Sequence, residues 1–346
     1  MKDLLFVTPP TEDYLSDGML VGLKQILGAR VVDFPKRDSL YKSFGAQQLA
    51  ECYGRGFTLF GTLEDEAVDR SGVYQRLLAG EFGGVIVGEL WWNWGWVLQN
   101  LPILAKTPTV LLDGVDSMRV FPCSGEHLWK PYGWTLPKLH RHFPTLKREL
   151  SSSAAKLGLL ERFLPDWLTR MGNRLSVPKG LFPTAFSIPE EKIVVDLPEK
   201  TKQFPSHIVD EEVQQAVAGS GSSYAFDTEQ EYYADLRASR FGITTKRAGW
   251  DCMRHYEIAA NAAVICFRDL DLKPETCAPH GLVDGENCIA YKSVPDLMAR
   301  IESLSEQRYQ EIQQNSLAWV RSNTCRVRAQ HLLNTYMAIG NCETVS

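Results

Sequence analysis

Short apolar runs alternate with helical patterns along the first third of the chain. The runs at 4–9 (LLFVTP), 83–90 (GGVIVGEL) and 108–114 (PTVLLDG) are apolar at consecutive positions, which is typical of strands buried on both faces of a parallel sheet. The segment DGMLVGLKQILG carries apolar residues at helical spacing, and we expect this helix to end at Gly28. Further strands are predicted at ARVVDFP and at 56–60 (GFTLF), with helices near VYQRLLAGEF and WVLQNLPILA.

The same alternation returns in the second half of the chain. Helices are predicted over DEEVQQAVA and EQEYYADLRAS, and strands at 192–198 (KIVVDLP), 223–226 (SYAF) and RFGITT. The pattern weakens between Phe121 and Pro183, and the run 178–192 is interpreted as a crossover between domains. Because a domain holds roughly 150 residues, a chain of 346 residues is expected to hold two. The sequence therefore predicts an α/β protein of two Rossmann-like, doubly wound domains facing a cleft, residues 1–185 and 186–346.

The composition is that of a globular protein. Hydrophobic residues make up 44% of the chain and charged residues 23%, with a formal net charge of −5, which excludes disordered and fibrous classes. The chain has no stripe of Lys and Arg, so no nucleic-acid partner is expected. The start, MKDLLFVTPP, is too short in its apolar part for a signal peptide, and no run approaches the ~18 residues that span a bilayer. We expect a cytoplasmic protein without a transmembrane segment, and peripheral membrane contact stays open.

No cofactor or metal site is expected from the sequence. The eight cysteines are scattered, with no CxxC pair and no Cys/His ligand spacing, so they are interpreted as free thiols in a reducing compartment. The run GSGSS at 219–223 follows a predicted helix and precedes a predicted strand, which is the reverse of the phosphate-loop order. Asp269-Leu270-Asp271 follows a strand as a loop, and we assign no metal to it.

Polar residues follow the predicted strands of the first half, where ligands of such sheets bind. Asp17, Glu89 and Asp113 are candidates for catalytic acid–base work, although loop carboxylates are commonly helix caps or turn residues. The run LKREL (146–150) is basic and favours a solvated helix end over a phosphate contact.

Four tryptophans crowd together after the strand at 83–90. Their aromatic faces are suited to a sugar ring, so Trp91, Trp92, Asn93 and Trp94 are predicted to form a loop platform for an acceptor. The alternative is that these rings cap the core, as aromatic side chains often do.

The most informative segment is KRAGWDCMRHYEIAANAAVICF, which predicts a strand, a turn and a helix. Gly249 marks the turn, and Asp251 is the predicted N-cap of the helix. The free N–H groups and dipole of a helix start attract anions, and Lys246 and Arg247 stand beside this one. An anion site is therefore predicted here.

Glu257 lies three residues after Arg254 on this helix, among apolar and small residues. A buried carboxylate needs hydrogen-bond donors, and the two hydroxyls of a ribose would supply them. An ion pair with Arg254 is the structural alternative. The residues alone leave both interpretations open.

The order of segments GWDCMRHYEIAANAAVICF, APHGLVDGENCIAY, SVPDLMARIESL and QEIQQNSLAWVRSN resembles the carboxyl-terminal domain of GT-B glycosyltransferases. In particular, it is similar to spore-maturation-like and exostosin-like members. In those families the turn and helix start hold the donor diphosphate, and the helix glutamate holds the ribose. The resemblance thus implies a donor site formed by Thr245, Lys246, Arg247, Gly249, Trp250, Asp251, Arg254 and Glu257.

The activity implied by this resemblance is metal-independent transfer of a sugar from a nucleotide-diphosphate-sugar to a hydroxyl of a glycan or glycoconjugate. The first domain would then be the acceptor side, and an inverting enzyme would draw its base from Asp17, Glu89 or Asp113. Many retaining members carry an earlier glutamate where this chain has Gly249 and Asp251, so the stereochemistry stays open. The alternatives are a nucleotide-sugar epimerase or hydrolase of the same fold, and an inactive carbohydrate- or nucleotide-binding relative.

Overall fold

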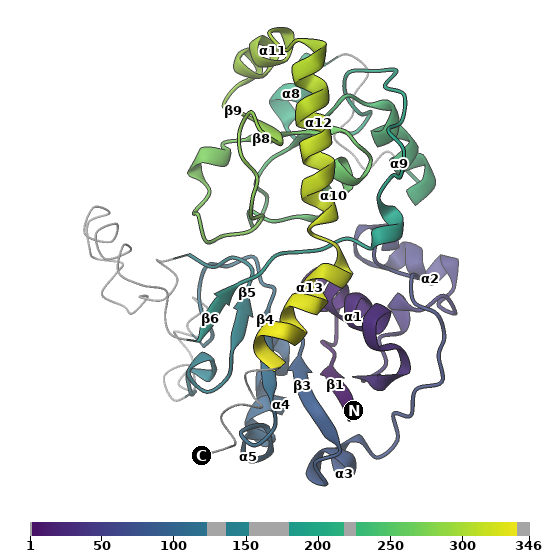
Figure 1. Ribbon diagram of the computed structural model, residues 1–346, viewed down its shortest axis with the longest axis vertical. Coiled ribbons are helices and arrows are strands. Elements are labelled where there is room, and N and C mark those ends of the chain that lie inside the picture. Colours follow the sequence, from purple (N-terminus) through teal and green to yellow (C-terminus); the bar gives the residue numbers. More distant parts are fainter. Residues whose placement is uncertain (1, 123–135, 152–179, 218–225, 338–346) are drawn as a thin grey trace, which may run out of the picture.

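The computed structural model describes residues 2–122, 136–151, 180–217 and 226–337. These residues form a six-stranded and a three-stranded parallel sheet. In Figure 1 the smaller sheet lies above the larger one, and helices surround both. Within the described ranges, no helix is long and apolar enough to cross a bilayer.

The first sheet has the strand order β2-β1-β3-β4-β5-β6. Its strands are β1 (Asp3–Val7), β2 (Val31–Phe34), β3 (Phe82–Val87), β4 (Thr109–Asp113), β5 (Thr145–Lys147) and β6 (Leu181–Pro183). The accompanying helices are α1 (Tyr14–Leu27), α2 (Ala46–Glu51), α3 (Val73–Leu78), α4 (Leu90–Gln99) and α5 (Leu101–Leu104). Alternate residues of β1 enter different cores, Phe6 on one face and Leu5 on the other. This confirms the predicted sheet buried on both faces.

The second sheet has the order β7-β8-β9. Its strands are β7 (Phe241–Thr244), β8 (Val264–Arg268) and β9 (Cys288–Tyr291). The helices are α8 (Glu211–Ala216), α9 (Glu229–Ala238), α10 (Met253–Ala260), α11 (Val294–Glu302) and α12 (Glu306–Arg321). In β8, Phe267 enters one core and Cys266 the other, so this sheet is also covered on both faces.

Helix ends follow from local chemistry. Asp13 caps α1, because its Oδ1 accepts the Ser16 N–H at 2.7 Å. The same helix ends at Gly28, whose φ of 58° is accessible to glycine without a Cβ clash. The prediction of a helix end at Gly28 is confirmed.

Two predicted strands do not form. The run 56–60 follows the 3₁₀ turn η3 (Tyr53–Gly56), and Thr58 adopts a left-handed φ of 72° that no strand accommodates. The run 192–198 follows the 3₁₀ turn η6 (Glu190–Lys192), and the Val194 N–H donates to the Ala260 carbonyl at the end of α10. Its apolar residues therefore border a helix. The predicted strand SYAF, apart from its last residue, and the run GSGSS lie outside the described residues.

Helix α13 (Cys325–Leu332) brings the end of the described chain back to the first domain. It packs against α1, and the two helices lie side by side in Figure 1. Close approach is possible because Gly22 faces the Cys325 backbone, where a Cβ would lie 2.0 Å from the carbonyl oxygen. One continuous core therefore includes residues of both sheets. The domain division at 185/186 stays a prediction.

Gly22→Ala is expected to destabilise the protein by forcing α1 and α13 apart. Overpacking of a tight contact costs about 1–3 kcal/mol or more, and here the clashing atoms are backbone. Urea unfolding measures the change. The matched control is Gly95→Ala in α4, because no atom lies within 4 Å of its added Cβ and alanine favours helix by up to about 1 kcal/mol. Equal stability of both variants would contradict the packing argument.

Candidate functional site

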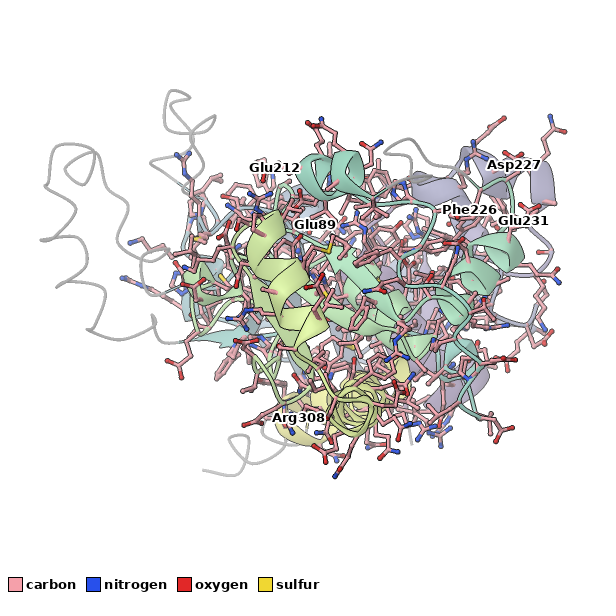
Figure 2. All side chains as sticks on the ribbon, turned by 90° about the horizontal axis from the view of Figure 1, so that it is seen from above. Glu89, Glu212, Phe226, Asp227, Glu231 and Arg308 are labelled. Atoms are coloured by element: carbon pink, nitrogen blue, oxygen red, sulfur yellow. The ribbon has the colours of Figure 1, made fainter. Side chains whose placement is uncertain are left out.

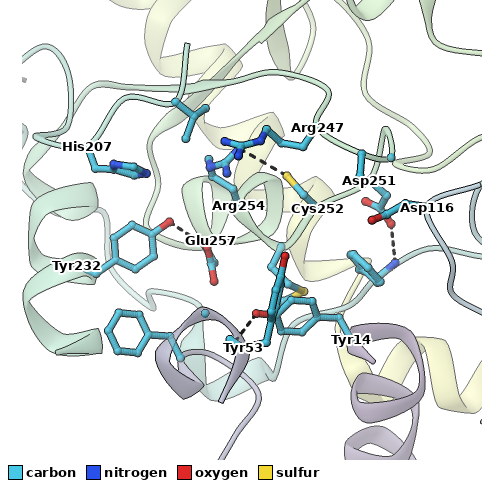
Figure 3. Close-up of a pocket in the computed structure, with 17 residues that line it drawn as sticks. Tyr14, Tyr53, Asp116, His207, Tyr232, Arg247, Asp251, Cys252, Arg254 and Glu257 are labelled. Carbon is cyan, nitrogen blue, oxygen red and sulfur yellow. Dashed lines mark hydrogen bonds between the residues drawn. The ribbon is translucent and has the colours of Figure 1, made fainter. Parts of the chain in front are cut away.

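A cleft of about 470 Å³ lies between the two sheets. Its first wall includes residues that come after strands β1, β4 and β6 in the chain. Its second wall includes residues that come after β7 and residues of α10. Ligands of parallel sheets bind at these carboxyl ends. The residues that line the cleft include Tyr14, Tyr53, Phe57, Asp116, Phe186, Tyr232, Arg247, Gly249, Asp251, Cys252, Met253, Arg254 and Glu257 (Figure 3).

Two guanidinium groups, of Arg247 and Arg254, face the cleft from the second domain and lie beside each other in Figure 3. The Arg254 Nη1 lies 3.4 Å from Thr244 Oγ1 and 3.8 Å from Cys252 Sγ. Among the residues that the structure describes, neither guanidinium has a carboxylate oxygen within 4 Å. Positive charge that is not bound to a carboxylate favours an anionic ligand.

The start of α10 also faces the cleft. Cys252 stands at the N-cap position, and no side chain caps the helix there. The Asp251 carboxylate instead accepts the Phe186 N–H at 2.8 Å and the Tyr256 hydroxyl at 3.0 Å. The prediction of Asp251 as N-cap is therefore wrong. The uncapped first turn, with Met253 lining the cleft, adds to the attraction for anions.

Glu257 is 8% exposed and lines the same cleft. Its Oε1 accepts the Thr58 hydroxyl at 2.5 Å, and its Oε2 accepts the Tyr232 hydroxyl at 2.9 Å. Burial raises the pKa of Glu257, and these two hydrogen bonds offset part of the rise. No ion pair joins Glu257 to Arg254 within 4 Å, although both side chains are described. The environment is one in which the carboxylate receives hydroxyl donors.

A loop of the first domain reaches across to Glu257. The Thr58 hydroxyl also lies 2.9 Å from the Tyr233 hydroxyl. The Arg55 guanidinium donates to the Phe226 carbonyl at 3.0 Å and to the Asp227 carboxylate at 2.6 Å. Figure 2, viewed from above, shows Phe226 and Asp227 together beside α9. Because Arg55 and Thr58 both have left-handed φ values, which are unfavourable for side chains with a Cβ, the loop holds a strained shape that these contacts stabilise.

The run 146–150 is not the solvated helix end that the sequence favours. Its first two residues lie in strand β5, and the rest come directly after that strand. The residues Lys147, Arg148 and Glu149 are at most 1% exposed. Glu149 Oε1 accepts the N–H groups of Trp250 at 2.8 Å and Asp251 at 3.1 Å. A carboxylate from the first domain therefore already holds the turn at which the sequence predicts an anion.

Arg148 completes this contact between the domains. Its Nη1 donates to the Asp251 carbonyl at 2.8 Å, and its Nη2 donates to the Gly114 carbonyl at 2.9 Å and to Asp116. Gly249 is needed for the approach, since a Cβ there would lie 2.6 Å from Glu149 Oε1. We call these two residues the Arg148–Glu149 pair.

The three carboxylates predicted as catalytic are buried and bound to protein groups. Glu89 accepts the Trp91 N–H at 3.1 Å and the Gly114 N–H at 2.8 Å, and burial raises its pKa well above the ordinary value. Asp113 pairs with Lys147 at 3.0 Å.

Asp17 is the third of these carboxylates and pairs with Arg37 at 2.9 Å. None of the three lines the cleft as described. Asp116 is the acidic residue among the first-domain residues that line it.

The predicted tryptophan platform is a helix and not a loop. Trp91, Trp92, Asn93 and Trp94 lie in the first turns of α4. Trp91 and Trp94 pack on Phe121 with ring centroids 5.2 Å and 6.1 Å apart, whereas Trp92 is 62% exposed. The Asn93 amide donates to the Gly88 carbonyl at 2.6 Å. Two of the rings thus cap the core, and the aromatic residues that line the cleft come from other segments.

The cleft-lining aromatic residues on the side of the first sheet are Tyr14, Tyr53, Phe57 and Phe186, the last of which comes shortly after β6. Of the remaining predicted donor residues, Thr245 and Lys246 flank the cleft without lining it, and the Lys246 ammonium lies 5.4 Å from the centre of the Trp250 ring. Within the described ranges, no group of three His, Cys, Asp or Glu residues is arranged to hold a metal ion.

Solved structures resemble this chain over nearly its whole length. HepE (Alr3699) of Anabaena, solved in complex with UDP-glucose, superimposes with a TM-score of 0.54 at 9% identity, covering 98% of this chain and 100% of that one. An α,α-trehalose-phosphate synthase (UDP-forming) from Burkholderia vietnamiensis gives 0.50 at 12% identity, covering 99% and 100%.

No protein-family model matches the chain, and no curated protein matches its sequence. The structural likeness shows the fold, which is the GT-B arrangement of two Rossmann-like domains. The predicted fold class is confirmed.

Asp17→Asn is expected to remove a pH dependence of stability. Burial raises the pKa of Asp17 from the ordinary 3.8 to about 6, against the opposing effect of Arg37. The folded state thus holds this proton more tightly than the unfolded state. Stability that is present below about pH 4 is lost as the pH rises to about 6, by at most about 3 kcal/mol.

Urea unfolding between these pH values measures the decline, which should be shallower in Asp17→Asn than in the wild type. Asp38→Asn is the control, because the Asp38 side chain is 62% exposed. A decline of the same slope in the wild type and Asp17→Asn would contradict the assignment of the buried proton.

Proposed function

We propose that this protein transfers a sugar from a nucleotide-diphosphate-sugar to a hydroxyl group of a glycan or glycoconjugate. The observation that carries the proposal is the pairing of two opposite chemistries in one cleft. Arg247 and Arg254 present positive charge without a carboxylate partner, and Glu257 presents a buried carboxylate to hydroxyl donors. A nucleotide-sugar donor has the two matching features, a diphosphate and a ribose diol.

The diphosphate is assigned to the guanidinium groups and to the start of α10. When the glycosidic bond breaks, negative charge grows on the leaving nucleoside diphosphate, and fixed positive groups at that position lower the barrier. Arg247 and Arg254 supply this charge, so the proposal needs no metal. The N–H groups of Trp250 and Asp251, part of the donor site implied by the resemblance, are bound by Glu149, so we place the diphosphate nearer to Arg254.

The ribose is assigned to Glu257. Each carboxylate oxygen carries two lone pairs, and in the structure each receives one protein hydroxyl. A ribose diol would use the remaining lone pairs or take the place of Thr58. UDP-sugars are the first donors to test, because HepE is solved with UDP-glucose and the trehalose-phosphate synthase is UDP-forming. Membership of the spore-maturation-like or exostosin-like families is part of the same proposal.

The acceptor is assigned to the wall of the cleft that lies on the side of the first sheet. Tyr14, Tyr53 and Phe186 offer aromatic faces that suit the apolar side of a sugar ring. The Asp116 side chain is 52% exposed and pairs with Arg148, and it is the carboxylate positioned to act as a base in an inverting reaction. A cytoplasmic location and the division into domains at 185/186 belong to this proposal as well.

A thermal-shift screen tests the donor proposal. UDP-, GDP-, TDP-, ADP- and CMP-sugars are compared with and without EDTA, and one nucleotide class should raise the melting temperature equally in both conditions. At a ligand concentration 100 times Kd the stabilisation is about 2.7 kcal/mol. If no nucleotide sugar raises the melting temperature, the proposed donor binding is contradicted. If EDTA abolishes the rise, the proposed metal independence of donor binding is contradicted.

Arg254→Gln should weaken UDP binding about 10–100-fold, because a charge-assisted hydrogen bond contributes about 1.5–3 kcal/mol. Isothermal titration measures Kd, and urea unfolding checks that stability is kept. Arg300→Gln is the matched control, since Arg300 is exposed and pairs with Asp284 away from the cleft. If both variants bind UDP equally well, Arg254 does not hold the diphosphate.

Glu257→Gln should weaken donor binding far more than it lowers stability, because the amide replaces one acceptor oxygen by a donor while its shape is retained. The same titration with UDP-glucose measures this. Equal losses of binding and of unfolding free energy would favour a purely structural role for Glu257.

Product analysis without an acceptor separates sugar transfer from hydrolysis or epimerisation of the nucleotide sugar.

A further inference from the structure

Cys252 differs from the other described cysteines in its place and its surroundings. It is half-buried and lines the cleft, whereas Cys266, Cys277, Cys288 and Cys325 are buried, and burial raises the pKa of each of their thiols. Cys52 is also half-buried, and its pKa is raised by burial. The proposed sugar transfer does not use a thiol, so it does not explain why a thiol lies in the cleft.

A base and a cation stand beside the Cys252 sulfur. Sγ lies 3.4 Å from His255 Nε2 and 3.8 Å from Arg254 Nη1, and the residue occupies the N-cap position of α10. A neighbouring imidazolium, a guanidinium and a helix N-terminus each favour the thiolate. A nucleophile within reach of an oriented base is the arrangement that activates side chains for covalent chemistry.

His255 is held so that its charged form is supported. Nε2 lies 2.9 Å from the Trp250 carbonyl and Nδ1 lies 3.1 Å from Thr244 Oγ1, so both ring N–H groups of an imidazolium have acceptors. The ring stacks on Phe267 at 4.7 Å. Burial, the largest single effect, lowers the pKa of His255, but Cys252, Asp251 and the Trp250 carbonyl together outweigh it and the net shift is upward.

The same interactions act on the thiol. Burial raises the pKa of Cys252, and the charges of His255 and Arg254 more than offset this, lowering the pKa from 9.0 to about 7. Asp251 acts in the opposite direction. Arg247, which lines the same cleft, adds positive charge. A large fraction of Cys252 is therefore thiolate at neutral pH.

We propose that Cys252 is a nucleophilic thiolate and a site of oxidation by hydroperoxides, placed where the donor diphosphate binds. The sulfur attacks one oxygen of hydrogen peroxide and the O–O bond breaks. The hydroxide that leaves takes the proton of the His255 imidazolium to form water, and Cys252 becomes a sulfenic acid. Sulfur is oxidised by two electrons and the peroxide is reduced by two.

Oxidation changes the cleft in charge and in volume. The added oxygen lies beside Arg254, because the sulfur already does, and the loss of the thiolate and imidazolium pair alters the field at the start of α10. This consequence rests on the proposed function, whereas the reactivity of the thiol does not. The modified cleft is expected to bind a nucleoside diphosphate more weakly.

Alkylation kinetics on the full chain test the thiolate. The rate of modification by iodoacetamide is followed at each cysteine by peptide mass spectrometry over a range of pH. Cys252 should react half-maximally near pH 7, as its pKa requires, and faster than Cys52 at that pH. His255→Gln, or Arg254→Gln if the first variant does not fold, should move the midpoint upward. Cys52→Ser is the control and should leave the rate at Cys252 unchanged.

Hydrogen peroxide with dimedone, which traps sulfenic acids, should label Cys252 before Cys52. A Cys252 that alkylates no faster than Cys52, or that gives no dimedone adduct, would overturn the proposal. UDP should slow the labelling of Cys252. If the thiol reacts as expected but UDP has no effect, the shared location and the proposed donor site are overturned, and the thiolate is supported by the other two results.

Discussion

The contact between the Arg148–Glu149 pair and the turn at 249–251 fixes the geometry of the cleft. Glu149 accepts two N–H groups of the turn, and Arg148 donates to its Asp251 carbonyl. Both charges are buried, and removal of one partner from a buried pair costs about 3–5 kcal/mol. The pair therefore holds the first turn of α10 against strand β5, and the positions of Arg254 and Glu257 in the cleft depend on it.

Much of the fold can be predicted from the sequence because its signals are local. The strands β1, β3 and β4 are predicted from consecutive apolar residues, and the end of α1 is predicted from Gly28. The runs 56–60 and 192–198 have the same composition but do not become strands, because a strand also needs a neighbour. Thr58 instead reaches Glu257, and Val194 meets the end of α10.

The site divides in the same way. Arg254 and Glu257 can be predicted because the helix that carries them also carries the family resemblance, and both line the cleft. Glu149 and Thr58 cannot be predicted, because they come from distant segments and meet Trp250 and Glu257 only in the folded chain. Buried charged residues produce no periodic pattern in the sequence, so the sequence predicts an exposed run at 146–150. Only the partners of these residues in the folded chain explain their burial.

A structure with UDP-glucose bound tests the central claim most directly. The account predicts the diphosphate within hydrogen-bond distance of Arg254, the ribose hydroxyls at Glu257, and Glu149 still bonded to the turn at 249–251. A nucleotide bound outside the cleft would contradict it. A diphosphate seated on the Trp250 and Asp251 N–H groups, with Glu149 displaced, would also contradict it.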